Sequence, residues 1–273
     1  MLQTRSWLPR TEGSVRLSFV RRGNDTALET LHQAGAMRAR FPRPADGAAP
    51  EAVLLNTAGG LTGGDRIAVD VALAAGAAAT VTSAAAEKIY RARDDEAAIR
   101  VRIALGPGAR LGWLPQPTIL FDQARLDRAT EVELAGDASF LGVEMLIFGR
   151  AAMGEDVHHG AARDRWRVRR DGALVFADAL RADGAIAGIL DRKATLDGAR
   201  ASAMLLYAAP DAAARLDEVR TLLQGGASVA GASAWNGLLA VRALARDGRT
   251  LQRDMAAVLV ALSGRPLPRV WQC

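Results

Sequence analysis

One five-residue pattern recurs three times in this chain, about every thirty residues. It has the form Leu-x-x-(Gly/Asp)-Ala, and its copies occupy residues 73–77, 105–109 and 134–138. Each copy lies between two runs of alternating apolar and polar residues, which is typical of half-buried strands. Each copy therefore predicts a β-hairpin. Because one hairpin cannot cover its own apolar face, the repeat predicts stacked layers of sheet. The alternative is that so short a pattern recurs by chance.

The composition changes near Ala199, where helical periodicity first appears. Residues 210–224 and 251–262 have the spacing of amphipathic helices, and short strand-like runs occupy residues 204–207 and 238–244. Glycine pairs or a Gly-x-Pro sequence end both helices. We therefore expect a mainly β body at residues 1–198, and a small β-α-β-β-α unit at residues 199–273 that packs on the body.

A glycine-rich loop at residues 56–65 precedes the first copy of the repeat. Four of its ten residues are glycines, Gly59, Gly60, Gly63 and Gly64, and the loop ends at Asp65. It lacks the Gly-Lys-Ser/Thr of a Walker loop. It also leads into a strand, whereas a dinucleotide fingerprint leads into a helix. A tight structural turn before a strand is the simplest interpretation.

Composition indicates a soluble cytoplasmic globule. Half of the 273 residues are hydrophobic. No apolar run reaches the roughly 18 residues of a membrane helix, and the first residues do not resemble a secretory signal. The one cysteine, Cys273, excludes an internal disulfide. These features favour the cytoplasm and a chain that does not enter membranes.

Basic residues number 35 against 30 acidic ones, and all but Lys88 and Lys193 are arginines. Alternation places Arg163, Arg165, Arg167 and Arg169 on one face of a strand. This face is interpreted either as a solvated outer surface or as a docking surface for an acidic partner. A phosphate track for nucleic acid is a rival hypothesis, and it predicts binding that weakens steeply with salt. Trp166 is the one aromatic residue in this strand, which disfavours the rival.

Ligand and catalytic patterns are scarce. The sequence has no Cys-x-x-Cys or His-x-x-x-His pair, so a structural zinc site is not predicted. It has no Gly-x-Ser-x-Gly elbow either, and no nucleophile can be paired with a histidine by spacing. Several carboxylates do lie near glycines, and oxygen ligands hold nickel or magnesium weakly enough for exchange. Surface solvation or pairing with arginine is the alternative for each of them.

Three unusual segments lie between the predicted hairpins, at residues 87–96, 115–121 and 149–155. They follow strands at similar places in successive repeats. Stacking would therefore gather them on one edge of the molecule, where a shared site could form.

Five segments together resemble the urease accessory protein D family, which is called H in some bacteria. Gly59-Gly60-Leu61-Thr62-Gly63-Gly64-Asp65 is similar to its Gly-Gly-x-x-Gly-Gly-Asp hallmark, although Ala58 stands where prolines are common. Residues 88–91, 113–121 and 149–155 are similar to its Lys-x-Tyr-Arg, Trp-Leu-Pro-Gln-x-x-Ile-x-Phe and Gly-Arg-x-x-x-Gly-Glu segments, and residues 268–271 to its C-terminal ending. The matching residues are Gly59, Gly60, Gly63, Gly64, Lys88, Tyr90, Pro115, Gln116, Gly149, Arg150 and Gly154. The match extends from about Gly13 to Trp271.

This resemblance implies a maturation factor that is not an enzyme. The family has a mainly β, β-helix-like stack of sheets with few helices. It binds apo-urease and accessory protein F, which recruits the GTPase accessory protein G, and the assembly delivers Ni²⁺ to the urease active site. No stably bound cofactor is implied; Ni²⁺ would pass in transit.

We therefore expect a protein scaffold with a water-filled route for nickel. Its expected lining residues are Asp65, Glu87, Glu144 and Glu155. Trp235, Leu238 and Trp271 are candidates for an apolar partner surface.

Overall fold

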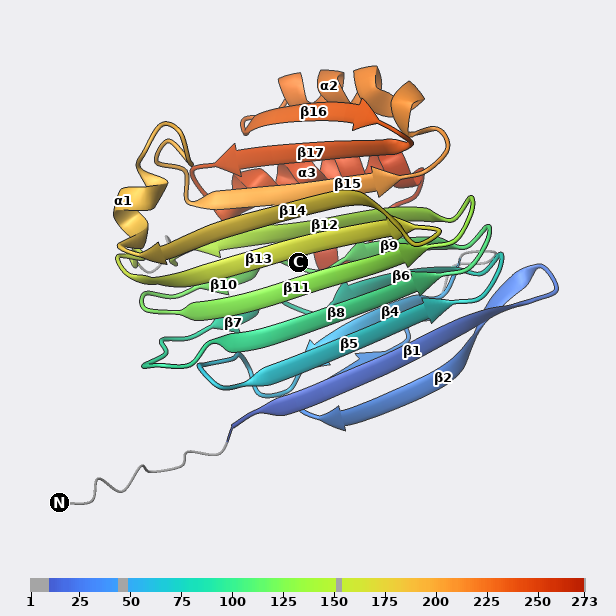
Figure 1. The fold of residues 1–273 in the computed structure, drawn as a ribbon, viewed down its shortest axis with the longest axis horizontal. Helices are drawn as coiled ribbons and strands as arrows, with labels where there is room; N and C mark the ends of the chain where they lie inside the picture. Colours follow the sequence, from blue (N-terminus) through green and yellow to red (C-terminus); the bar gives the residue numbers. More distant parts are fainter. Residues whose placement is uncertain (1–9, 44–48, 151–153, 273) are drawn as a thin grey trace.

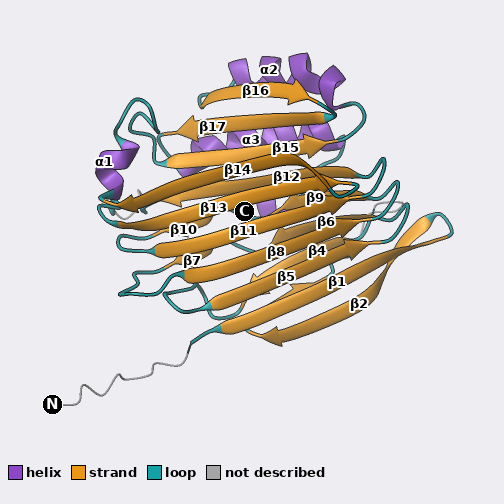
Figure 2. Cartoon of the chain, in the orientation of Figure 1, coloured by secondary structure: helices purple, strands orange, loops and turns teal. Residues whose placement is uncertain are grey.

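Two β-sheets face each other and enclose the main hydrophobic core (Figure 1). This computed structural model describes residues 10–43, 49–150 and 154–272. In both sheets, the strands of successive repeats lie next to each other and are joined by hydrogen bonds, as the prediction of stacked layers requires. Strands far exceed helices in this architecture (Figure 2), which confirms the expected mainly β fold.

The first sheet has seven strands in the order β14-β13-β11-β8-β5-β1-β2. Its strands are β1 (Glu12–Arg22), β2 (Asp25–Gly35), β5 (Arg66–Leu73), β8 (Ala97–Leu105), β11 (Arg125–Leu134), β13 (Gly160–Arg170) and β14 (Ala173–Gly184). The five inner strands, from β1 to β13, are parallel, and the hairpin partners β2 and β14 form antiparallel edges.

The second sheet has ten strands, eight of them in the order β16-β17-β15-β12-β9-β6-β4-β3. Its strands from the repeats and their flanks are β3 (Met37–Arg40), β4 (Glu51–Asn56), β6 (Ala78–Ser83), β9 (Arg110–Leu114) and β12 (Ser139–Phe148). The short strands β7 (Glu87–Ile89) and β10 (Thr118–Leu120) extend β12 on one side. The last three are β15 (Ala201–Ala208), β16 (Val229–Trp235) and β17 (Leu238–Ala245).

The five-residue repeat marks the passage from one sheet to the other. The strand before each copy lies in the seven-stranded sheet and the strand after it lies in the ten-stranded sheet. The predicted hairpins are therefore wrong. Each strand instead bonds in parallel to its equivalent in the next repeat, so that Val69 of β5 stands opposite Val101 of β8, which stands opposite Thr130 of β11. The last residue of each copy is an alanine that is buried between the sheets, where a larger side chain would have little room (Ala77, Ala109 and Ala138).

The C-terminal part has the expected order of elements. After β15 come a 3₁₀ turn (Ala212–Arg215), α2 (Leu216–Gln224), β16, β17 and α3 (Gly248–Ser263). Asp247 caps α3 by accepting from Thr250 N, and Gly264 ends it in a left-handed conformation. The two helices cover a second hydrophobic cluster on the outer face of the ten-stranded sheet. No helix among the described residues is long and apolar enough to cross a membrane.

The boundary between body and appendage, at residues 198 and 199, stays a prediction. β15 pairs with β12 in an antiparallel ladder from Phe140 to Ile147, so the sheet continues from one part into the other. A short helix, α1 (Ile186–Leu190), lies between β14 and β15 in the sequence, and its Ile186 and Leu190 belong to the main core.

Candidate functional site

The loops that carry the sequence motifs stack at one end of the molecule. Leu61 of the glycine loop bridges to Ile89 of β7, β7 pairs with β10, and β10 pairs with the end of β12. Backbone bonds continue the ladder, since Leu61 N donates to Lys88 O at 2.8 Å and Phe121 N donates to Ile89 O at 3.0 Å. The expectation that stacking gathers these loops on one edge is therefore confirmed.

Tyr90 explains why the glycine loop needs Gly60. The Tyr90 hydroxyl donates to Gly59 O at 3.0 Å, so the ring lies across the loop. A Cβ at Gly60 would stand 2.4 Å from Tyr90 Cε2 and 2.8 Å from Lys88 O, and the residue has a φ of +149°. A side chain there would clash with the next layer. Gly63 is similarly close to Asp95 O, and Gly64 to the Arg10 side chain.

A stack of side chains continues from Tyr90 across the loops. Tyr90 meets Phe121 edge to face at 4.9 Å, and the Arg150 guanidinium lies 4.2 Å from the Phe121 ring centre. Arg150 Nε in turn donates to Glu155 Oε2 at 2.5 Å. Glu155 O lies against Gly149, where a Cβ would be 2.3 Å away. Gly154 turns the chain beside them with a φ of +67°, whereas residues 151–153 of this motif lie outside the described residues.

Two of the predicted route carboxylates are held by hydrogen bonds within this loop end. Asp65 is 4% exposed, and it accepts from Thr11 N at 2.7 Å and from Thr62 N at 2.8 Å. It therefore closes the glycine loop. Glu87 accepts from Asn56 Nδ2 at 3.1 Å. Burial raises the pKa of Glu87, and the Asn56 hydrogen bond opposes that rise.

The Pro115-Gln116 segment joins the stack to the C-terminal part. Gln116 Nε2 donates to Val270 O at 2.9 Å, and Gln252 of α3 donates to Gln116 Oε1 at 2.9 Å. Trp271 Nε1 donates to Leu114 O at 3.0 Å from the 3₁₀ turn at Arg269–Trp271. Leu238 is 1% exposed and Trp271 is 9% exposed. The prediction that these two residues form a partner surface is therefore wrong, because both belong to the core, while Trp235 is 39% exposed.

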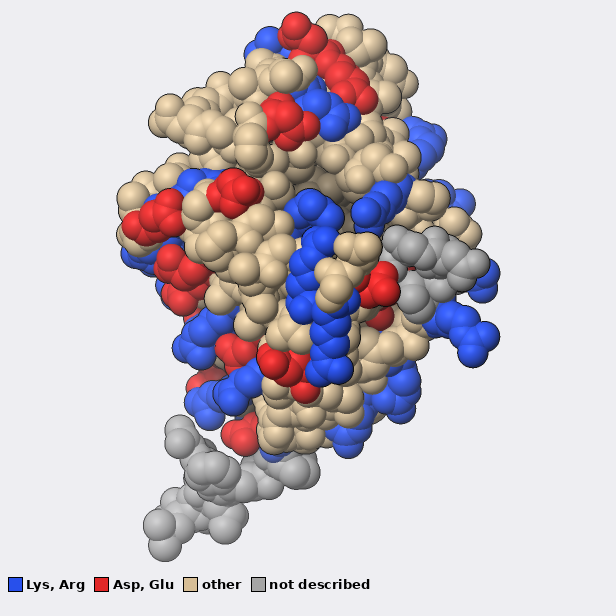
Figure 3. Space-filling model, turned by 90° about the vertical axis from the view of Figure 1, so that its right-hand side faces the viewer, with Lys and Arg blue, Asp and Glu red and all other residues tan. Residues whose placement is uncertain are grey.

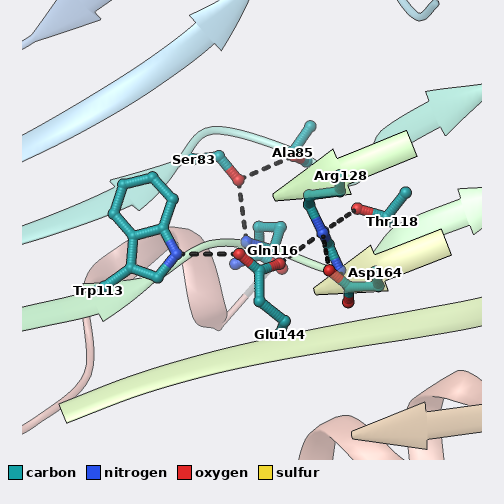
Figure 4. A network of polar contacts seen from close by, with 8 residues as sticks. All are labelled: Ser83, Ala85, Trp113, Gln116, Thr118, Arg128, Glu144 and Asp164. Carbon is teal, nitrogen blue, oxygen red and sulfur yellow. Dashed lines mark hydrogen bonds and ion pairs between the residues drawn. The ribbon is translucent and has the colours of Figure 1, made fainter. Parts of the chain in front are cut away.

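Glu144 belongs to a buried charge network between the sheets (Figure 4). Arg128 of β11 is its centre, with NH1 2.5 Å from Glu144 Oε2 and a two-point contact to Asp164 at 2.9 and 2.6 Å. Arg128 also donates to Thr118 Oγ1, and Trp113 Nε1 donates to Glu144 Oε1 at 3.0 Å. The side chains of Arg128, Glu144 and Asp164 are 4%, 3% and 9% exposed. One arginine thus faces two buried carboxylates.

Sequence reasoning missed Arg128 and Asp164, although a signal was present. Arg128 alternates with Leu126 and Thr130 on the buried face of β11, so the alternation itself places a cation inside. Asp164 stands directly opposite Arg128 in the parallel register of β11 and β13. Charges at inward positions of two neighbouring strands predict a buried pair.

Glu144 and Asp164 lie at the wall of a cavity of about 310 Å³. Residues of β14, β15 and β17 line the cavity, together with residues of α1 and of the segment after it. Its walls are largely apolar, with Leu146, Phe148, Leu180, Met204 and Leu244. Asp178 of β14 and Arg242 of β17 form an ion pair between the two sheets beside it.

Burial raises the pKa of the Glu144 carboxyl to about 7; the Arg128 charge opposes this shift, and the Asp164 charge adds to it. The unfolded chain releases this proton near its ordinary value of 4.5, whereas the folded chain holds it until about 7. Stability from this group is therefore lost as pH rises between these values, and the loss is complete above the folded pKa.

Glu144→Gln should remove this pH dependence, because glutamine does not titrate. We expect the unfolding free energy of the wild type to fall by roughly 2–3 kcal/mol relative to the variant between pH 5 and pH 8, with the decline ending near neutrality. Urea unfolding of both proteins across that range measures the difference. Parallel curves would show that Glu144 does not titrate in this window.

The four predicted route carboxylates are not gathered into one metal centre. Asp65 precedes β5, Glu87 starts β7, Glu144 is inside β12, and Glu155 follows β12. Within residues 10–43, 49–150 and 154–272, no group of three or more His, Cys, Asp or Glu side chains could hold a metal ion. A route that uses them stays a prediction.

The arginines of β13 lie on the outer face of the seven-stranded sheet, as expected, and two of them have acidic partners. Arg165 NH2 is 2.6 Å from Asp127 Oδ1, and Arg169 NH1 is 3.7 Å from Glu133 Oε1. Figure 3 shows a further column of basic side chains at the end of the stack where β5, β8 and β11 finish, with acidic groups beside it. Acidic neighbours reduce the attraction of the β13 face for phosphates.

A family model described as UreD urease accessory protein matches residues 11–272. The chain belongs to the UreD family of urease accessory proteins. The urease accessory protein UreD of Xanthobacter autotrophicus is 52% identical over 262 residues, which cover 96% of this chain and 90% of that protein. UreD proteins of Azorhizobium caulinodans and of a Methylobacterium species are each 49% identical, over 96% and 98% of both chains.

Family membership confirms the resemblance seen in the sequence and supports a role in urease maturation. The names of these UreD relatives describe accessory proteins and name no reaction of their own.

Proposed function

We propose that this chain is a non-enzymatic scaffold of urease maturation that passes Ni²⁺ toward apo-urease. In this proposal it binds apo-urease and the F-type accessory protein, and the G-type GTPase supplies nickel through the F-type protein. Nickel is cargo and is not a resident cofactor. The cytoplasm is the compartment that the proposal requires.

The observation that carries the proposal is the buried network around Glu144. Two carboxylates face one arginine, so above the Glu144 pKa of about 7 the network has an excess of one negative charge at the wall of a cavity. Such a site attracts a divalent cation. Carboxylate oxygens also exchange nickel more readily than thiolates or a set of imidazoles would.

Glu144→Gln tests the route with little change in shape. The variant is co-expressed with the F-type and G-type proteins and apo-urease, and co-purification reports assembly. We expect the complex to assemble while the nickel content of urease, measured by mass spectrometry, falls severalfold. Glu133→Gln is the matched control, because Glu133 is 53% exposed on the outer face of β11.

The same measurements apply to Asp65→Asn, Glu87→Gln and Glu155→Gln. Asp65 closes the glycine loop, so loss of assembly in Asp65→Asn would indicate a folding role and not a route. If all four variants assemble and load nickel as the wild type does, the route proposal is wrong. Binding to nucleic acid, the rival function, predicts an affinity that falls steeply with salt, and the paired arginines of β13 argue against it.

A further inference from the structure

The seven-stranded sheet ends before the ten-stranded sheet does. β14 is the last strand of the first sheet, whereas β17 and β16 carry the second sheet further in the same direction (Figure 1). Two contacts place the inner face of β14 on these strands. Asp178 pairs with Arg242 of β17, and the Phe176 ring centre lies 6.2 Å from that of Trp235 at the end of β16. The next strand position in the first sheet therefore lies over β16, and no described strand fills it.

The face of β16 that points to this position is exposed and apolar. Trp235 stands opposite Leu238 of β17, and Leu238 belongs to the core between the sheets, so Trp235 points to that side of its sheet. Val229 lies on the same side, because six residues separate the two and side chains alternate along a strand. Val229 is 78% exposed and Trp235 is 39% exposed, whereas Ala232 on the other side is buried under the helices.

The free edge of β14 supplies the hydrogen-bonding groups that an added strand needs. Among the described strands, β14 pairs only with β13. In an antiparallel ladder every second residue directs its N–H and C=O away from the partner strand, so these groups of β14 point into the space over β16. The stretch from Phe176 to Leu180 has one charge, on Asp178, and Arg242 neutralises it. A backbone edge beside an apolar face is the arrangement that binds an extended segment.

A second copy of this chain does not fit this position through its own β14. The contacts of Asp178 with Arg242 and of Phe176 with Trp235 hold β17 and β16 against the inner face of β14 in every copy. In a symmetric pair joined at the β14 edges, the β16 strands of both copies would therefore occupy the same space. The position fits a segment that is a single strand with no second sheet packed against it.

We propose that an extended segment of a partner protein binds here as an added strand of the seven-stranded sheet. Its backbone pairs with β14 between Phe176 and Leu180, and its apolar side chains, at every second residue, cover Val229 and Trp235. The inward side of the segment carries no charge, because β16 has no charged residue to pair with it. This inference rests on the proposed scaffold role, which supplies the partner proteins.

Hydrogen exchange in the assembled complex tests the strand addition. The full chain is co-expressed with the F-type and G-type proteins and apo-urease, and mass spectrometry with electron-transfer fragmentation follows its single amides. Relative to the free chain, we expect about tenfold slower exchange at every second amide between Phe176 and Leu180. Docking through side chains alone would not produce this alternation. Unchanged exchange of β14 in an assembled complex would overturn the inference and leave the scaffold role intact.

A charge on the exposed face of β16 gives the matched test. Val229→Arg places a cation where the segment is apolar, so it should remove the protection of β14 and lower the recovery of the partner proteins severalfold. Leu31→Arg is the control, because Leu31 is 41% exposed on β2 at the opposite edge of the same sheet, and it should change neither.

Three other results would overturn the inference. The first is an equal effect of Val229→Arg and Leu31→Arg. The second is a concentration-dependent dimer of the free chain that protects β14, because a second copy would then be the occupant. The third is a wild-type chain that assembles no complex, and only this result would overturn the proposed scaffold role as well.

Discussion

Replacing Arg128 by methionine is expected to lower the unfolding free energy by about 3–5 kcal/mol. Methionine preserves much of the side-chain length but leaves Glu144 and Asp164 as two buried carboxylates without a cation. Such a loss is a large fraction of the 5–15 kcal/mol typical of a folded domain. Urea unfolding of the purified chain, kept soluble by a fusion partner where needed, measures the change.

Two further variants test the cause of this loss. Arg102→Met is the matched control, because Arg102 is 69% exposed on the outer face and its contact with Asp70 is 3.9 Å long; we expect a change below about 1 kcal/mol. Adding Glu144→Gln and Asp164→Asn to Arg128→Met removes the uncompensated charges, so stability should partly return. No recovery in the triple variant would mean that packing, and not charge, sets the cost.

Trp271→Ala is expected to destabilise the chain by about 3–5 kcal/mol. The Trp271 ring is buried beside α3, and its N–H holds Leu114 O at the start of the Pro115-Gln116 segment. Removal would therefore leave a cavity and release the contact between the C-terminal turn and the stacked loops. The thermal midpoint and the urea midpoint should both fall.

Trp235→Ala separates folding from partner binding. Trp235 is 39% exposed and lies 6.2 Å from the Phe176 ring, so its loss should change stability by much less than the loss of Trp271. A reduced co-purification of the F-type protein or apo-urease with a normally folded Trp235→Ala chain would support the predicted partner role of this residue. Equal destabilisation by both tryptophan variants would contradict the burial difference.

The alternation of apolar and polar residues, and the recurrence of the five-residue pattern about every thirty residues, were sufficient to predict the stacked layers of this fold. Ile67, Val69 and Val71 face inward as their spacing indicates, and their equivalents stack above them. The hairpins were wrong for a physical reason. Alternation reports which face of a strand is buried, but it does not report which neighbour accepts its hydrogen bonds. A turn of four or five residues fits a hairpin and a passage between sheets equally well in sequence.

The candidate site was predicted in part. Glu144 was selected among carboxylates near glycines, and the motif loops were expected to gather on one edge. Asp65 instead accepts hydrogen bonds from backbone N–H groups, and Glu155 is paired with Arg150. The Arg128 and Asp164 pairing depends on strand register, which a single sequence without its topology does not provide. The cavity beside them is lined by residues of β12, β13, β14, β15 and β17, so it depends on how segments far apart in the sequence pack together.

The ladder between β12 and β15 limits how the two ends of the molecule can move. Eight consecutive residues of each strand are paired, so a hinge at Ala199 would have to break that ladder. The molecule should therefore turn as one rigid plate in a larger assembly. If one protein bound at α2 and α3 and another bound at the loop end, the rigid sheet would therefore fix their distance and relative orientation.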